Sequence, residues 1–110
     1  MSEYGLEILA DLAAAIACRK GASPEASYTA KLFSQGVEKC AKKLGEEAIE
    51  TALAAVLGDK AHIASESADL LYHLLVLLEA TDVKLAHVMA ELARRKGLSG
   101  IAEKARRPKA

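Results

Sequence analysis

The chain has 110 residues, of which 52% are hydrophobic and 4% aromatic, and its 15 basic side chains balance 15 acidic ones. This length predicts one domain over residues 1–110, and the balanced charge argues against a protein that binds nucleic acid or a membrane surface. Two cysteines are too few for a disulfide framework, and neither a signal peptide nor an apolar run of about 18 residues is evident, so we expect a cytoplasmic protein.

The first half of the chain predicts two helices. Ala and Leu make up much of the apolar share and β-branched residues are sparse, which favours helices. Apolar residues recur at helical spacing over residues 3–17, and Gly21 follows the basic end of that helix. A short helix is expected at residues 28–35, with Ser27 or Ser23 as its N-cap.

Two long helices follow. The first covers residues 37–57, and Gly58 breaks it, while Asp59 can cap the second helix at residues 60–80. Residues 70–78 of the second helix are apolar nearly all round, which is typical of a helix buried on most sides. In so small a protein a partner subunit is the natural cover, so we expect residues 70–78 at or near the contact of a homodimer.

The last predicted helix spans residues 85–96, and a polar, basic tail begins at about residue 97. We therefore expect an all-α fold, a bundle of four to five helices that is completed by homodimerisation.

Two acidic pairs lie on the two long helices. At about 100° per residue, Glu47 and Glu50 share one helix face, and Glu66 and Asp69 share a face that is otherwise apolar. Antiparallel helices can bring the pairs together. Four carboxylates at an apolar edge repel one another and are costly to desolvate, and a divalent cation removes both penalties. Oxygen ligands favour Mg²⁺, with Mn²⁺ as a substitute.

The acidic pairs resemble a known family motif. Glu47-x-x-Glu50, a spacer of 15 residues and Glu66-x-x-Asp69 are similar to the ExxE…ExxD motif of the all-α nucleoside triphosphate pyrophosphatase superfamily, which includes MazG-like proteins and dimeric dUTPases. The likeness extends over about residues 4–107 to the phosphoribosyl-ATP pyrophosphohydrolases. The segments that carry it are residues 27–32, 43–50, 66–78, 91–95 and 99–104.

The resemblance implies Mg²⁺-dependent hydrolysis of phosphoribosyl-ATP to phosphoribosyl-AMP and pyrophosphate, the second step of histidine biosynthesis. It also implies that Glu47, Glu50, Glu66 and Asp69 bind the metal. The catalytic candidates are Glu46, Glu47 and Glu50, of which either Glu46 or Glu50 could take the proton from the attacking water.

Several basic residues are candidates for binding the substrate. Lys43 could bind phosphate or pair with Glu47 one turn later. His73 is expected to be a core histidine bonded to a carboxylate. Further phosphate-binding candidates, favoured by their positions in the family, are Lys31, Arg94, Arg95 and Lys104.

Two other functions compete with this reading. A housekeeping nucleoside triphosphate pyrophosphatase of the MazG or dUTPase type would use the same metal motif, and only the flanking segments favour phosphoribosyl-ATP. A helical interaction module without catalysis would show no metal dependence.

Overall fold

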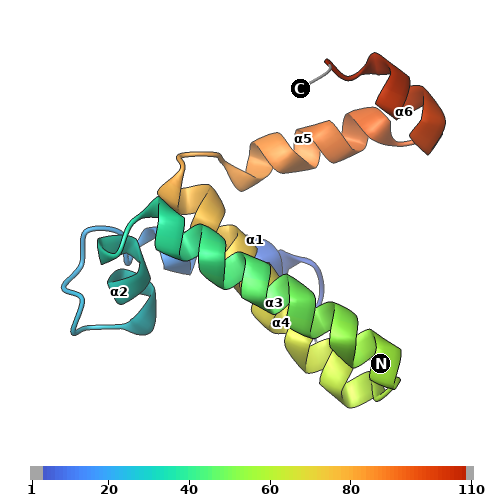
Figure 1. The fold of residues 1–110 in the computed structure, drawn as a ribbon. Coiled ribbons are helices and arrows are strands. Elements are labelled where there is room, and N and C mark those ends of the chain that lie inside the picture. The colour runs from blue at the N-terminus through green and yellow to red at the C-terminus, as the bar shows by residue number, and fades with distance from the viewer. Residues whose placement is uncertain (1–3, 109–110) are drawn as a thin grey trace.

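The computed structural model describes residues 4–108, which form six α-helices and no strand, so the predicted all-α class is confirmed. No helix in this part of the chain is long and apolar enough to cross a membrane. Figure 1 shows the six helices: α1 (Glu7–Ala17), α2 (Tyr28–Ser34), α3 (Val37–Leu57), α4 (Lys60–Ala80), α5 (Leu85–Arg95) and α6 (Gly100–Arg106).

The helices α3 and α4 form the long antiparallel hairpin of the fold, and each has 21 residues. Gly58 ends α3 with φ of 79°, a left-handed conformation that glycine adopts at little cost. The Asp59 carboxylate then accepts hydrogen bonds from the backbone N–H groups of Ala61 (3.1 Å) and His62 (3.2 Å). These two residues set the turn that lays α4 back along α3.

The core lies where α1, α2 and α3 meet the second half of α4. Its buried members are Ile16, Leu32, Cys40, Leu75 and Val76. Residues 70–78 therefore owe part of their apolar character to the core of their own chain, and only one of their large apolar side chains, that of Leu71, is exposed.

The helices α5 and α6 form an arm that leaves the end of α4 and diverges from the other four helices (Figure 1). The radius of gyration is 15.9 Å, whereas a compact chain of this length has about 13 Å. Helix α5 of this arm is amphipathic. None of its residues is buried, so its apolar face is not covered by the other described helices.

The sequence predicts a polar tail from about residue 97, whereas the structure forms helix α6 at Gly100–Arg106. Its N-cap is Ser99, whose hydroxyl accepts a hydrogen bond from the Ala102 N–H at 3.0 Å. The helix has no apolar side chain in the core, so its sequence lacks the periodic apolar pattern that identifies the other helices.

Candidate metal centre

A threonine joins the two long helices at the level of the acidic pairs. The Thr51 hydroxyl on α3 lies 2.8 Å from the Glu47 carbonyl oxygen and 3.1 Å from the Glu66 carbonyl oxygen on α4, and its one hydrogen is shared between these two acceptors. The contact holds the backbones of Glu47 and Glu66 close together, so their side chains emerge at the same place between the helices.

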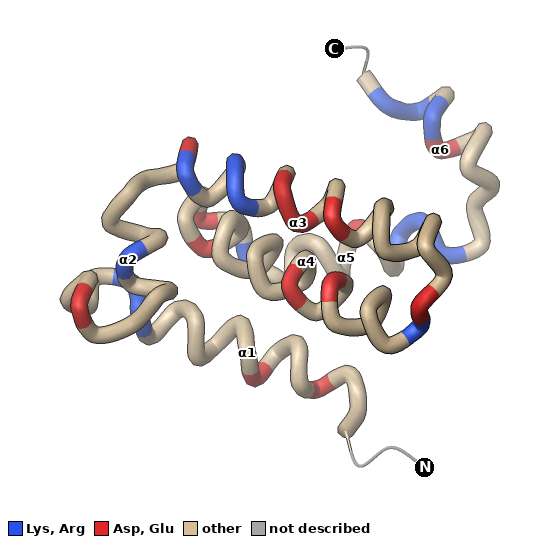
Figure 2. The backbone as a smooth tube through the Cα atoms, turned by 60° about the horizontal axis from the view of Figure 1, so that its bottom comes forward, with Lys and Arg blue, Asp and Glu red and all other residues tan. Residues whose placement is uncertain are grey.

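Three of the four predicted carboxylates converge at this place. Glu47, Glu66 and Asp69 each offer one oxygen, and these oxygens all lie within 4.8 Å of one another. One oxygen of Glu47 and one of Glu66 are buried without a hydrogen-bond partner. In Figure 2, acidic positions lie on both α3 and α4 along the stretch where the helices pack. A buried carboxylate oxygen without a partner is costly, and a cation between the three groups would satisfy it.

Glu50 lies beside the same cluster and affects both of its half-buried members. Desolvation raises the pKa of Glu47 and of Glu66, and a hydrogen bond to Glu50, its charge and that of Asp69 raise each further. Lys43 acts in the opposite direction on Glu47, and so does His62 on Glu66, whose Oε1 lies 3.6 Å from the His62 Nε2. The fourth predicted carboxylate is therefore close to the other three, and Glu47 and Glu66 bind protons more readily than ordinary glutamates do.

His73 is buried one turn after Asp69 and connects α4 with α2. Its Nδ1 lies 3.0 Å from the Asp69 carbonyl oxygen, which can only accept, so Nδ1 carries the proton. Its Nε2 then accepts from the Tyr28 hydroxyl at 3.2 Å. His73 therefore donates to a backbone carbonyl oxygen, and not to the carboxylate that the sequence predicts. A second bond between α2 and α4 joins the hydroxyls of Thr29 and Tyr72, and together these contacts fix α2 beside the carboxylates.

A basic cavity of about 220 Å³ lies between α2 and α3. Lys31 and Lys43, which are expected from the sequence to bind phosphate, both line it, and Tyr28 is part of the same wall. Lys39 lines it as well and was missed from the sequence, although it lies one turn before Lys43 and so shares its face. Burial is the main cause that raises the pKa of the Tyr28 hydroxyl. Lys43 lowers it, and the charges of Glu47 and Glu46 act on it in the raising direction, so cavity and carboxylates adjoin.

Lys43 pairs with Glu46, not with Glu47. Its Nζ lies 3.2 Å from Glu46 Oε1, and this contact lowers the pKa of Glu46. Of the two candidate general bases, Glu46 is thus held by a lysine, while Glu50 lies beside the carboxylate cluster.

The other basic candidates lie on the arm. Arg94 and Arg95 are on α5 and pair with Glu91 and Glu103, and Lys104 is an exposed residue of α6. Within residues 4–108 no hydrogen bond or ion pair connects them to the carboxylates of α3 and α4. Lys31 and Lys43 therefore line the cavity beside the cluster, whereas Arg94, Arg95 and Lys104 lie on α5 and α6.

Comparisons with known proteins agree on one family. The model of the family described as phosphoribosyl-ATP pyrophosphohydrolase matches residues 9–96. The chain is 62% identical over 104 residues to the phosphoribosyl-ATP pyrophosphatase of Ruegeria pomeroyi, which covers 94% of this chain and 99% of that protein. Proteins of the same name from Cereibacter sphaeroides and Dinoroseobacter shibae are 62% and 61% identical over 102 residues, or 93% of this chain and 99% and 100% of theirs.

Proposed function

The chain belongs to the phosphoribosyl-ATP pyrophosphohydrolase family, and we propose that it hydrolyses phosphoribosyl-ATP to phosphoribosyl-AMP and pyrophosphate, the second step of histidine biosynthesis. The observation that carries the proposal is the convergence of Glu47, Glu66 and Asp69 beside a lysine-lined cavity. The test is a product assay on phosphoribosyl-ATP and on ordinary nucleoside triphosphates. A housekeeping pyrophosphatase would accept the ordinary triphosphates equally well.

We propose that Glu47, Glu50, Glu66 and Asp69 hold Mg²⁺, with Mn²⁺ able to replace it. The cluster fits a hard divalent cation, because its donors are carboxylate oxygens and two of them are buried without a partner. A bound Mg²⁺ would neutralise phosphate oxygens and stabilise the charge that develops on the leaving pyrophosphate.

The other candidate residues bind the phosphates of the substrate or take up the proton of the attacking water. Lys31, Lys39 and Lys43 line the cavity and supply positive charge for the phosphates. The attacking water forms a bond to the α-phosphorus while the bond to the bridging oxygen breaks. Glu50 takes the proton of this water with the carboxylate oxygen that the metal leaves free, because Lys43 lowers the pKa of Glu46 and makes it the weaker base.

Mg²⁺ should stabilise the protein most strongly at neutral pH. Because the pKa values of Glu47 and Glu66 are raised in the folded protein, their contribution to stability is present below the ordinary value of 4.5 and is lost as pH rises through the raised values. Mg²⁺ binds only the ionised cluster and reverses that loss. At a hundred times its Kd, a ligand adds roughly 2.7 kcal/mol, so we expect a Tm increase of several degrees at pH 7.5 and a smaller one at pH 5.

The measurement is thermal unfolding followed by circular dichroism, in EDTA or in MgCl₂, with NaCl at equal ionic strength as the control. Equal Tm values in EDTA and MgCl₂ at pH 7.5 would count against the metal centre.

We also propose that the protein is a homodimer. Four large apolar side chains on the second half of α3 are 59–84% exposed, and two more are exposed on α5; they are Ile49, Leu53, Val56, Leu57, Met89 and Leu92. Large apolar side chains exposed in this number are typical of an interface. The proposed contact then centres on α3 and α5. Of residues 70–78, which the sequence places at or near the contact, only Leu71 has an exposed large apolar side chain.

Sedimentation at micromolar concentration should give twice the chain mass of 11.6 kDa. Leu53→Lys should shift the protein toward the monomer, because it places a charge in the buried interface. Leu6→Lys, at an exposed apolar position before α1, serves as the control. A stable and active monomer in the unmodified protein would contradict the dimer.

We further propose a single domain over residues 1–110 and a cytoplasmic location. Cys18 and Cys40 are both free thiols, and Cys18 is exposed, which suits a reducing compartment.

A further inference from the structure

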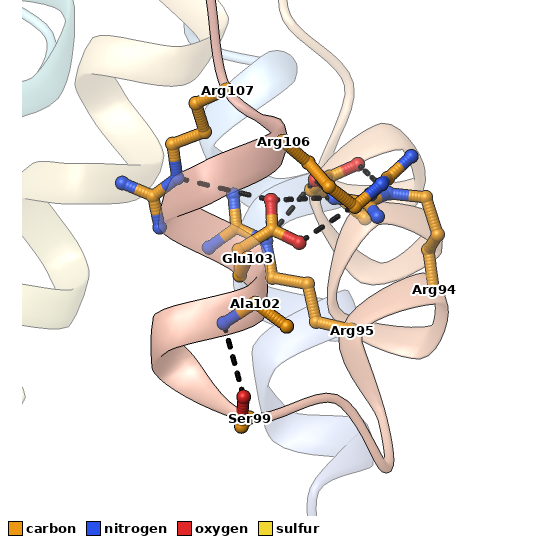
Figure 3. A network of polar contacts seen from close by, with 8 residues as sticks. Arg94, Arg95, Ser99, Ala102, Glu103, Arg106 and Arg107 are labelled. Carbon is orange, nitrogen blue, oxygen red and sulfur yellow. Dashed lines mark hydrogen bonds and ion pairs between the residues drawn. The ribbon is translucent and has the colours of Figure 1, made fainter.

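Four arginines surround one buried carboxylate on the arm (Figure 3). The side chain of Glu103 on α6 is only 7% exposed, and Arg94 from α5 donates to its Oε1 at 2.8 Å. Arg95, Arg106 and Arg107 also place guanidinium nitrogens at 3.7, 3.6 and 3.8 Å from its two oxygens. Two of these arginines come from α5, and the other two come from the end of α6 and the residue after it.

This network, and not apolar packing, holds α6 against α5. Ile101 of α6 is 85% exposed, and Leu98 in the connecting turn is exposed as well. Exposed ion pairs contribute little to stability, and a buried carboxylate costs free energy to desolvate. As a means of attaching seven residues the network is inefficient, which indicates another role.

The cluster carries excess positive charge. Four arginines face two carboxylates, since Glu91 also pairs with Arg94 and Arg95, which leaves a formal charge of +2. Arg94 and Arg95 lower the pKa of Glu91 to about 2, and Arg94 lowers the pKa of Glu103, so both carboxylates stay ionised at neutral pH. Between 36% and 57% of each arginine side chain remains exposed. A dianion would balance the charge and would accept hydrogen bonds from the guanidinium N–H groups that the two carboxylates do not use.

We propose that Glu103 is a positioning residue that gathers Arg94, Arg95, Arg106 and Arg107 into a site for a phosphate monoester dianion, the ribosyl phosphate of the substrate. The inference rests on the proposed function. The guanidinium fork matches phosphate geometry better than an ammonium group does. The carboxylate cluster and the lysine cavity serve the triphosphate, so the second anionic group of phosphoribosyl-ATP needs a site of its own.

A direct binding measurement distinguishes whether Glu103 positions the arginines or only neutralises their charge. The probe is ribose 5-phosphate, titrated in EDTA and followed through the arginine Nε–H signals in ¹⁵N NMR spectra. If Glu103 only neutralises the arginines, Glu103→Gln raises the local charge to +3 and tightens binding. If Glu103 positions them, the arginines separate and binding weakens at least about tenfold, the factor that corresponds to 1.4 kcal/mol. Glu38→Gln, at an exposed carboxylate in the first turn of α3, is the matched control and should change nothing.

Kinetics supply a second readout that a merely structural role would not reproduce. For phosphoribosyl-ATP, Glu103→Gln should raise KM about tenfold with little change in kcat, and Glu103→Asp should restore part of the affinity. The inhibition constant of ATP, which lacks the ribosyl phosphate, should not change. Arg106→Gln and Arg107→Gln should raise KM as well, while far-UV circular dichroism shows the same helix content.

Each outcome decides the proposal. Tighter or unchanged ribose 5-phosphate binding in Glu103→Gln overturns it, and so does the absence of any binding by the unmodified protein. Parallel losses for phosphoribosyl-ATP and ATP would show that Glu103 only maintains the fold. If ribose 5-phosphate binds as expected but phosphoribosyl-ATP is not hydrolysed, the proposed function fails and the phosphate site stands.

Discussion

Asp69→Asn should abolish Mg²⁺-dependent turnover while the helical fold survives. We expect a loss on the order of 10³-fold in kcat, which corresponds to about 4 kcal/mol of transition-state stabilisation. Asp69 contributes one of the three converging oxygens, and asparagine keeps its volume but removes the charge that a cation needs. The side chain is exposed, so the substitution leaves no cavity.

The sign of the stability change supports the same test. Asp69 repels Glu47 and Glu66, so the metal-free Asp69→Asn protein should unfold at an equal or higher temperature than the unmodified protein. Asp11→Asn, at an exposed position on α1, is the matched control and should leave activity and Mg²⁺ dependence unchanged. Near-normal turnover in Asp69→Asn would remove the basis of the metal centre.

The same series tests the general base. Glu50→Gln should lose turnover to a similar degree, because it removes both a metal ligand and the proposed proton acceptor. Glu46→Gln should keep most of the turnover, since Glu46 is engaged by Lys43 at 3.2 Å. The reverse order of effects would assign the proton transfer to Glu46.

The long hairpin could be predicted from the sequence because local signals determine it. Gly58 and Asp59 mark the break between two periodic segments, and the helices observed at 37–57 and 60–80 have the predicted bounds. The meeting of the acidic pairs also follows from local rules, since residues three apart share a helix face and the turn makes the helices antiparallel. The short helix and the last predicted helix each end one residue earlier than expected.

The partner that each side chain selects could not be predicted in this way. Lys43 had two possible acidic partners within one turn, and the packed side chains select Glu46. The bond from the Tyr28 hydroxyl to His73 depends on where α2 packs, and the gathering of four arginines around Glu103 depends on where α6 folds back. Charged residues at these positions look like ordinary surface residues in the sequence, because their burial comes from other helices.

The second large effect concerns the substrate and the bond that breaks. We expect kcat/KM for phosphoribosyl-ATP to exceed that for ATP at least about 10²-fold, because ATP lacks the ribosyl phosphate and leaves the groups that bind it unpaired. The carboxylate cluster and the lysine cavity adjoin, so they can hold the triphosphate with its β- and γ-phosphates as the leaving group. A comparable kcat/KM for ordinary triphosphates would favour a housekeeping pyrophosphatase.

Hydrolysis in ¹⁸O-labelled water tests the central claim most directly. Attack at the α-phosphorus places one ¹⁸O atom in phosphoribosyl-AMP and none in pyrophosphate, and mass spectrometry of the two products distinguishes them. We predict label in phosphoribosyl-AMP, unlabelled pyrophosphate, and no reaction in EDTA. Label in pyrophosphate, or orthophosphate as the first product, would contradict the proposed function.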